Sequence, residues 1–308
     1  MRLLFTIPHF FNPQGNGKHG SLQADPQPRL EALTRCIRAI YTLHGEAQSY
    51  FKHDVGTGRL QELAANETTR SRLDIVLCVY RDLHLLDRLP FDSSCYYVKQ
   101  FDSGDPILLG FGCHNVLRSN LGRYDYYCYL EDDLILHDPY LFVKLAWFNA
   151  QMGNGAVLQP NRFEVGRDRD LEKVYIEPDF ECQPPPSFAH NFSEGNEIAG
   201  RFLGREIRLD RAKNPHSGCF FLNREQMALW ASKDYFGDRD FWFVGPLESA
   251  ASVGIMKTFR TYKPAFINAN FLEIEHYGQS LSHYWRDRPQ FRYDLFSQHP
   301  DNQKRSDV

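Results

Sequence analysis

The sequence lacks several features that would place it in a familiar class of proteins. No run approaches the roughly 18 apolar residues that a membrane-spanning helix needs. Seven cysteines are present but no two are spaced as CxxC, which argues against a zinc knuckle. Most have apolar neighbours, so we expect free thiols and a reducing compartment. Lys and Arg total 35 against 39 Asp and Glu, and the net charge of −4 offers no general footprint for nucleic acid.

Signatures of several enzyme classes are missing as well. The chain holds no GxSxG nucleophile elbow, no HExxH zinc helix, and no Walker or dinucleotide-binding glycine motif where the first helix is predicted to begin. The segment MRLLFTIPHFFNPQ has too short an apolar run for a secretory signal. We therefore expect a cytoplasmic protein, and peripheral contact with a membrane surface stays open.

The chain is long and rich in aromatic residues. Its 308 residues, 42% of them apolar, are enough to bury a sizeable core in one large domain or two modest ones. It contains 24 Phe, 16 Tyr and 4 Trp, an aromatic fraction of 14%. Such side chains fill cores and also line sugar or base pockets, so composition alone assigns no function.

Residues 1–150 alternate between strand-like and helix-like patterns. Short apolar runs predict strands over 2–10, 73–80, 96–101 and 124–130. Helical spacing of apolar residues predicts helices over 28–43, over 108–121 and from Asp138-Pro139 onward. The alternation predicts an α/β fold with an open, mainly parallel, twisted sheet flanked by helices. Residues 44–71 look irregular or helical.

Residues 151–285 are expected to form a second half of the same domain, and 286–308 a polar tail whose last ten residues are disordered. The Arg-, Asp-, Glu- and Gly-rich stretch 161–213 predicts either an excursion that closes over a site or a surface loop with a hairpin. The remaining predictions are a strand over 217–222, helices over 224–232 and 246–256, and extended segments over 258–263 and 265–272.

The strongest local motif is an acidic run after a predicted strand. The segment YYCYL ends in Glu131, Asp132 and Asp133. Ligands of parallel sheets bind at the carboxyl ends of strands, and three adjacent acids repel one another unless a cation compensates them. Because oxygen ligands suit Mg²⁺ and Mn²⁺, the run favours one of these ions bound with a diphosphate. The alternative is a solvated acidic turn in which Asp132 or Asp133 caps a helix.

The segment LEDDLILHDPYLFVKLAWF resembles the metal-binding region of nucleotide-sugar glycosyltransferases of the GT-A fold, whose signature is Asp-x-Asp or Glu-Asp-Asp. It is closest in style to the inverting N-acetylglucosaminyltransferases, and the preceding GFGCHNVLRSNLGRYDYYCYLEDDL is also similar. The resemblance is clear over about residues 105–150 and extends in layout over 1–285. It implies a nucleotide-sugar-binding half at 1–150 and an acceptor-binding half at 151–285.

The resemblance also implies roles for individual residues. Asp133 would bind the metal, with His276 as the first choice and His283 as the second choice for a further ligand. Glu131 and Asp132 would bind the ribose or nucleotide sugar, or orient the metal's waters. Nucleotide-binding candidates also lie at the ends of the first three strands and nearby: Thr6, Pro8 and Phe10 for the base, Arg81, Asp82 and Asp102 for uracil or ribose, and Lys18 and Arg118 for the diphosphate.

Two acids compete for the role of general base that direct displacement at the anomeric carbon requires. Glu248 follows a glycine turn near the start of a predicted helix, where it equally well stabilises the helix dipole. Asp240 lies beside aromatic residues, and its alternative role is a surface ion pair. In NPHSGCFFLN, the resemblance places His216, Ser217 and Gly218 near the donor sugar; a tight turn into a core strand is the alternative.

These observations predict a metal-dependent glycosyltransferase that moves a hexosyl or N-acetylhexosaminyl group from a nucleotide sugar, first of all a UDP-sugar, to a saccharide or glycan acceptor. Inversion is favoured, although a retaining enzyme would not need the base. A nucleotidyltransferase remains an alternative, because residues 11–20 loosely resemble its glycine-rich loop. A non-catalytic carbohydrate- or calcium-binding protein is the other. The oligomeric state is not predicted.

Overall fold

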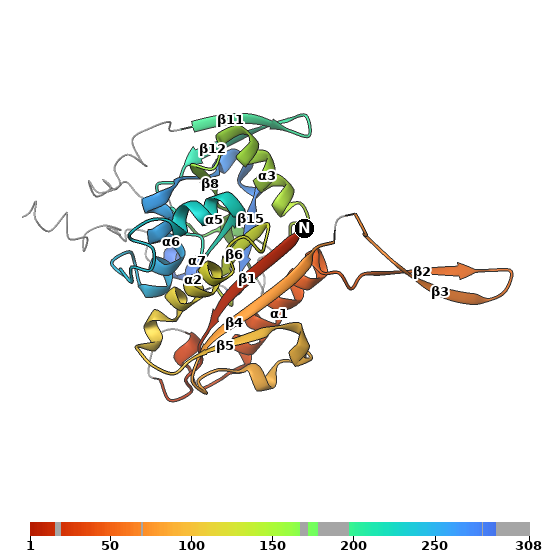
Figure 1. The fold of residues 1–308 in the computed structure, drawn as a ribbon, viewed down its shortest axis with the longest axis horizontal. Helices are drawn as coiled ribbons and strands as arrows, with labels where there is room; N and C mark the ends of the chain where they lie inside the picture. The colour runs from red at the N-terminus through yellow and green to blue at the C-terminus, as the bar shows by residue number, and fades with distance from the viewer. Residues whose placement is uncertain (16–19, 69, 167–171, 178–196, 279, 288–308) are drawn as a thin grey trace, which may run out of the picture.

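A computed structural model describes residues 1–15, 20–68, 70–166, 172–177, 197–278 and 280–287. Within them the chain forms a mixed α/β structure, as predicted (Figure 1). The tail expected to be disordered, the diphosphate candidate Lys18 and Cys182 lie outside these residues. The other six cysteines are all free thiols. No helix in the described part of the chain is long and apolar enough to cross a membrane.

A five-stranded sheet lies at the centre of the structure, with the strand order β13-β6-β1-β4-β5. Its strands are β1 (Arg2–His9), β4 (Arg72–Tyr80), β5 (Tyr97–Phe101), β6 (Tyr126–Leu130) and β13 (Cys219–Asn223). The first four are parallel to their neighbours, while β13 runs antiparallel to β6. The predicted open and mainly parallel sheet is thus observed.

The order of the strands creates a switch point between β1 and β6. From β1 the chain adds β4 and then β5 on one side, and it returns to place β6 on the other side. The connections that leave the carboxyl ends of β1 and β6 therefore diverge, which opens a crevice where ligands of such sheets bind. The acidic run directly follows β6.

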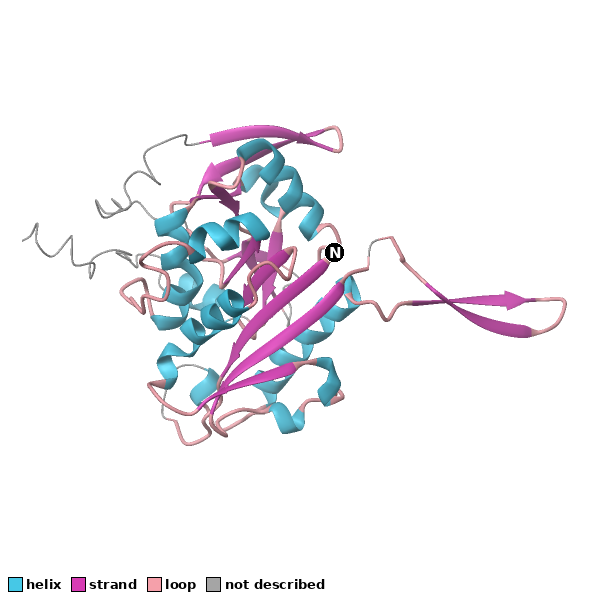
Figure 2. Cartoon of the chain, in the orientation of Figure 1, coloured by secondary structure: helices cyan, strands magenta, loops and turns pink. Residues whose placement is uncertain are grey.

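Helices cover both faces of this sheet (Figure 2). They are α1 (Gln27–His44), α2 (Leu109–Ser119), α3 (Leu141–Met152), α5 (Arg224–Ala231) and α6 (Pro246–Thr258). Because side chains alternate along a strand, β1 serves two cores: Phe5 packs in the cluster that contains Leu33 and Ile37 of α1, whereas Leu4 packs in the cluster that contains residues of α2, α5 and α6. Both faces of β1 are buried, which explains why its sequence does not alternate between apolar and polar residues.

The described chain also forms two four-stranded sheets, with the strand orders β10-β9-β15-β7 and β11-β12-β14-β8. Their strands are β7 (Leu134–Ile135), β8 (Ala156–Leu158), β9 (Asn161–Val165), β10 (Lys173–Tyr175), β11 (Glu197–Phe202), β12 (Arg205–Arg211), β14 (Arg260–Pro264) and β15 (Glu273–His276). In the first sheet, β15 pairs with both β9 and β7. The described parts of the stretch 161–213 are therefore built into these sheets and include a β11–β12 hairpin.

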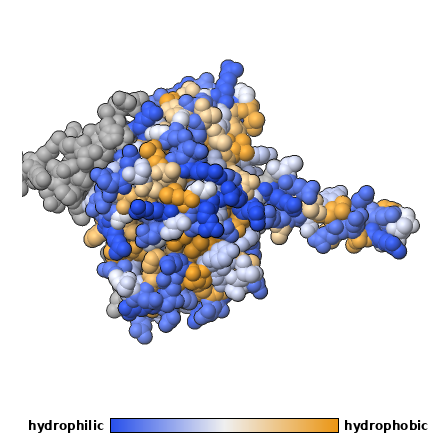
Figure 3. Space-filling view, viewed as in Figure 1, coloured by the Kyte–Doolittle hydropathy of each residue, from blue (hydrophilic) through white to orange (hydrophobic). Residues whose placement is uncertain are grey.

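The prediction for residues 44–71 was wrong. This region holds a β-hairpin of β2 (Ser49–Asp54) and β3 (Arg59–Ala64), which projects from the body of the molecule (Figures 1 and 3). Every residue of both strands is exposed. With neither face buried, the strands show no apolar–polar alternation, which is the signal that identifies a half-buried strand.

The extended segment predicted over 265–272 was also wrong, because residues 266–271 form the 3₁₀ turns of η6 (Phe266–Phe271). The Asn268 side chain fixes this turn: its Oδ1 accepts from the Arg208 N–H at 2.9 Å, and its Nδ2 donates to the Arg208 carbonyl at 3.0 Å. The remaining short helices are η1 (Gly20–Leu22), η2 (Leu86–Arg88), η3 (Ser93–Cys95), η4 (Pro106–Leu108) and α7 (Ser280–Asp287).

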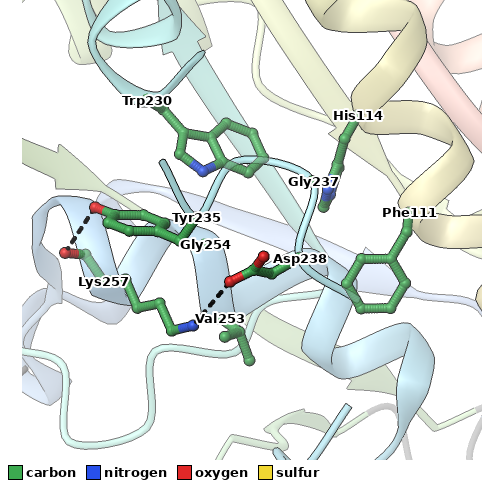
Figure 4. Close-up of a pocket in the computed structure, with 9 residues that line it drawn as sticks. All are labelled: Phe111, His114, Trp230, Tyr235, Gly237, Asp238, Val253, Gly254 and Lys257. Atoms are coloured by element: carbon green, nitrogen blue, oxygen red, sulfur yellow. Dashed lines mark hydrogen bonds and ion pairs between the residues drawn. The ribbon is translucent and has the colours of Figure 1, made fainter. Parts of the chain in front are cut away.

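A histidine lies in the core beneath α6. The ring centroid of His114 is 4.8 Å from that of Trp230, and both side chains line the pocket drawn in Figure 4. The His114 Nε2–H donates to the Ala250 carbonyl at 2.9 Å. Burial lowers the pKa of His114 from 6.5 to about 4, although the bond to the carbonyl opposes the shift. The folded state therefore holds this ring neutral under conditions in which the unfolded chain protonates it.

His114→Gln should flatten the acid limb of the stability curve. The unfolded chain binds a proton as the pH falls through 6.5 while the folded state resists until about 4. His114 therefore contributes its full stability above pH 6.5 and loses it below. From about pH 7.5 to about pH 5, wild type should lose about 2 kcal/mol more unfolding free energy than the variant, measured by urea denaturation. His53→Gln on the exposed hairpin is the control, and a variant curve parallel to wild type would contradict this origin.

Candidate active site

The acidic run lies at the switch point, at the carboxyl ends of β1 and β6. Glu131 and Asp132 are buried, with 5% and 1% of their surface exposed. The Glu131 N–H donates to the Gly218 carbonyl at 3.0 Å, so the turn before β13 holds the start of the run in place. The alternative of a solvated acidic turn is therefore wrong for these two residues.

Asp132 is held by His9, the last residue of β1. The Leu85 N–H donates to His9 Nε2 at 3.1 Å, so the proton of the ring lies on Nδ1. That nitrogen donates to Asp132 Oδ2 at 2.6 Å. Burial lowers the pKa of His9, with the bond to Asp132 opposing the shift, and the ring is neutral in this arrangement. His9 thus orients the carboxylate without cancelling its charge.

Arg29, in the first turn of α1, bridges the two aspartates. One guanidinium nitrogen pairs with Asp132 Oδ1, and another donates to Asp133 Oδ2 at 3.0 Å. Burial alone would lower the pKa of Arg29, but the attraction of Asp132 and Asp133 exceeds this penalty and raises it. The guanidinium therefore remains charged.

Glu131 is buried, and its carboxyl group has a more distant cationic partner than that of Asp133 has. Burial raises the pKa of Glu131 well above its ordinary value, although Arg162 opposes the shift from 3.6 Å. Arg162 is itself bound to Glu177, to which its Nε donates at 2.6 Å. Glu131 Oε1 is buried without a hydrogen-bond partner among the described residues. The shift favours the protonated form of the carboxyl, and one of its oxygens is unused.

His276 reaches the site because β15 pairs with β7, which places it opposite Leu134. Its Nδ1 lies 2.8 Å from Glu164 Oε1, and Glu164 also accepts the Ser282 N–H at 2.8 Å. Burial would raise the pKa of Glu164, but the bonds from His276 and Ser282 lower it. The ionised carboxylate fixes the proton on Nδ1 and leaves Nε2 pointing to the acidic run, 3.8 Å from Asp133 Oδ2.

Asp133 and His276 carry ligand atoms, a carboxylate oxygen and an imidazole nitrogen, that are suitable for a divalent metal. A carboxylate behind the ring, as Glu164 is here, is the usual support of a metal-binding histidine. Asp133 Oδ1 is buried and has no hydrogen-bond partner among the described residues. The described chain contains no group of three or more His, Cys, Asp or Glu side chains arranged around one ion. A metal held by two protein ligands would take its remaining ligands from phosphate oxygens and water, which is common for Mg²⁺.

The predicted sugar-side residues lie beside the acids but are committed to packing. Burial lowers the pKa of His216 to about 3, and its Nδ1 is 3.3 Å from Ser252 Oγ. The Ser217 hydroxyl donates to the Pro160 carbonyl at 2.8 Å. Gly218 has a φ of +63°, and a Cβ there would lie 2.7 Å from Glu131 Oε2. Glycine is therefore required for the close approach of this turn.

The structure separates the two base candidates. The half-buried Glu248 lies in the first turn of α6, and its charge helps to raise the pKa values of both Tyr129 and Glu131. Its carboxylate therefore acts electrostatically on these two groups, while its Oε2 lies over Gly245 at the start of the helix, 2.6 Å from where a Cβ of that residue would be. Asp240 is 46% exposed in its side chain and binds Lys257 Nζ at 2.9 Å. Lys257 lines the small pocket of Figure 4 together with Asp238.

The nucleotide candidates are divided in a similar way. The Thr6 hydroxyl donates to the Cys128 carbonyl at 3.1 Å, so it joins β1 to β6, and Pro8 is buried within β1. Arg81 Nε donates to the Asp102 carbonyl at 3.0 Å. Arg81, Asp82 and Asp102 are all exposed and directly follow β4 and β5. Two further candidates are placed elsewhere: Arg118 stacks over Phe236, and His283 lies on α7.

Sequence reasoning missed four side chains that hold the acids or their partners: His9, Arg29, Arg162 and Glu164. Arg29 and His9 had a usable signal, because both flank the loop that leaves the first strand at the predicted functional edge. The sequence carries no comparable signal for Arg162 and Glu164. Both lie on β9, which reaches the site only because it pairs with β15.

Comparison with known proteins gives little beyond this geometry. No protein-family model matches the chain, and no curated protein matches it. The crystal structure of S. aureus TarS is similar with a TM-score of 0.40 and 12% sequence identity, over 94% of this chain and 39% of that chain. The chain thus spans about two fifths of the length of TarS. A likeness this distant carries no functional argument, so the function is argued from the site.

Gly218→Ala should destabilise the protein more than Gly122→Ala. Both glycines have positive φ, +63° and +77°, but a Cβ on Gly122 meets no atom within 4 Å. Backbone strain should cost about 1–2 kcal/mol in each variant. The collision with Glu131 should add about 1–3 kcal/mol at Gly218. Chemical denaturation measures both losses, and equal values would show that Glu131 moves away freely.

Proposed function

We propose that the protein is a metal-dependent glycosyltransferase that moves a sugar from a nucleotide sugar, first of all a UDP-sugar, to a saccharide or glycan acceptor. One observation carries the proposal: the buried oxygens Glu131 Oε1 and Asp133 Oδ1 lack hydrogen-bond partners within the described chain, at the edge where parallel sheets bind ligands. Such groups are costly unless a ligand satisfies them. A metal-bound nucleotide sugar offers both a cation and hydroxyl groups.

Each acid has a distinct task in this proposal. Asp133 and His276 would hold Mn²⁺ or Mg²⁺, which when bound neutralises the charge of the leaving diphosphate. Asp132, oriented by His9 and Arg29, would accept hydrogen bonds from the ribose. Glu131, whose unpartnered Oε1 is buried, would bind a hydroxyl group of the nucleotide sugar.

Glu248 is the proposed general base. It would remove the proton of the acceptor hydroxyl as that oxygen attacks the anomeric carbon and the diphosphate departs, which inverts the configuration. It would act from the first turn of α6, close enough for its charge to influence Glu131. The exposed ion pair of Asp240 with Lys257 makes Asp240 the weaker candidate.

UDP and Mn²⁺ should stabilise the wild-type protein together by more than the sum of their separate effects, because each neutralises the charge of the other at one site. Asp133→Asn should abolish this extra rise in melting temperature and abolish turnover while the variant remains folded. Asp87→Asn, at an exposed aspartate, is the control. Additive shifts in wild type would count against a shared site. A response to ATP or CTP but not UDP would favour a nucleotidyltransferase, and binding without sugar transfer would favour a non-catalytic protein.

Glu248→Gln should lower the rate of sugar transfer by about 10²–10⁴-fold, because the amide cannot accept the proton. UDP affinity should change little, since the role proposed for Glu248 is contact with the acceptor hydroxyl and not with the diphosphate. Asp240→Asn is the matched comparison and should remain close to wild type. The anomeric configuration of the product, read by NMR, completes the experiment. An active Glu248→Gln with an inactive Asp240→Asn would transfer the role to Asp240, and a retained configuration would overturn the inverting mechanism.

A further inference from the structure

Arg29 occupies the place at the acidic run where an external cation would otherwise be needed. Its guanidinium contacts both Asp132 and Asp133, and only 15% of its side chain is exposed. The bond to Asp133 uses Oδ2, the same oxygen that faces His276 Nε2 at 3.8 Å. Arg29 and a metal held by Asp133 and His276 would therefore share one carboxylate.

The charges at this point are only partly balanced. Two carboxyl groups, those of Asp132 and Asp133, face the single guanidinium of Arg29, while the tautomer of His9 makes its ring neutral. The acidic side chains of this group therefore outnumber the cationic ones by one. A divalent cation would reverse the sign, and a diphosphate would then be attracted to both the metal and the guanidinium.

Two unsatisfied atoms indicate what this group still lacks. Arg29 Nε is buried and has no acceptor among the described residues, and Asp133 Oδ1 is buried and has no donor among them. One site thus presents an unused cationic N–H and an unused anionic oxygen. A metal–diphosphate complex provides an oxygen for the first and a cation for the second.

We propose that Arg29 is an internal counter-ion that Asp133 exchanges for the divalent metal, after which the guanidinium binds the diphosphate while it stays paired with Asp132. This inference rests on the proposed function. No covalent bond changes in the exchange; Arg29 moves one hydrogen bond from Asp133 Oδ2 to a phosphate oxygen. Arg29 would thereby favour entry of the metal together with the nucleotide over entry of the metal alone.

The exchange predicts opposite effects of Arg29 on two affinities. Without nucleotide, the guanidinium competes with the metal and repels it, so Arg29→Met should bind free Mn²⁺ about tenfold to hundredfold more tightly than wild type, the size expected for one charge a few ångströms away. With Mn²⁺ saturating, the same variant should bind UDP about tenfold or more weakly, because a phosphate ligand is lost. A purely structural arginine would weaken both.

The measurement is a Mn²⁺ titration followed by the EPR signal of free Mn²⁺, and a UDP titration by calorimetry at saturating Mn²⁺. Arg38→Met is the matched control, because Arg38 lies on the exposed side of the same helix, over Phe91. It should leave both affinities unchanged. Thermal unfolding verifies that each variant is folded. If Arg29→Met does not fold, Arg29→Lys replaces it; a lysine cannot bridge both acids, so the same two shifts should appear at smaller size.

The outcomes separate this inference from the function on which it rests. Wild type that binds neither Mn²⁺ nor UDP contradicts the proposed function itself. Wild type that binds UDP with Mn²⁺, combined with a folded Arg29 variant whose affinity for free Mn²⁺ is unchanged or weaker, overturns the exchange alone. If the Arg29 variant binds free Mn²⁺ more tightly but binds UDP with unchanged affinity, the proposed contact between Arg29 and the diphosphate is wrong.

Discussion

Compensation of carboxylate charge at the carboxyl edge of the sheet is the constraint on which the site depends. Three consecutive acids are brought to the end of β6, and two of them are buried. Each has a different neighbour: Asp132 has His9, Asp133 has His276, and Glu131 has Arg162. Arg29 joins the two aspartates. Burial raises the pKa of Glu131, whereas at Asp133 the effect of burial is outweighed by His276 and Arg29, which lower the pKa, so two carboxyl groups of one acidic run have pKa values shifted in opposite directions.

The sheet β10-β9-β15-β7 supplies part of this charge compensation. Arg162 and Glu164 lie two residues apart on β9. Arg162 pairs with Glu131 and Glu177, whereas Glu164 pairs with His276. Strand β15 pairs with β9 on one side and with β7 on the other. The sheet β10-β9-β15-β7 therefore positions charged side chains next to the acidic run at the edge of the central sheet.

The same groups link the structure to the proposed chemistry. A site whose acids were fully satisfied by protein partners would have no reason to bind a cation, and one without Arg29 would carry repelling buried charges. Asp133 lies between these limits, with one oxygen bound and one unsatisfied. Partial satisfaction of this kind is a property of binding sites, because buried polar groups are otherwise paired.

The sequence by itself determined the strands of the central sheet, the helices that cover it and the position of the acidic run, because these follow from local apolar periodicity and from chain order. It also directed attention to Glu248 and His276 through the resemblance of the motif. It did not reveal the exposed β2–β3 hairpin, since no buried face leaves an alternating pattern. Only the tertiary structure decided that Arg29, Arg162 and Glu164 compensate the acids and that Asp240 is engaged with Lys257 instead. Some of these contacts join residues more than a hundred positions apart in the sequence. The packing and strand pairing that bring them together leave no local signal in the sequence.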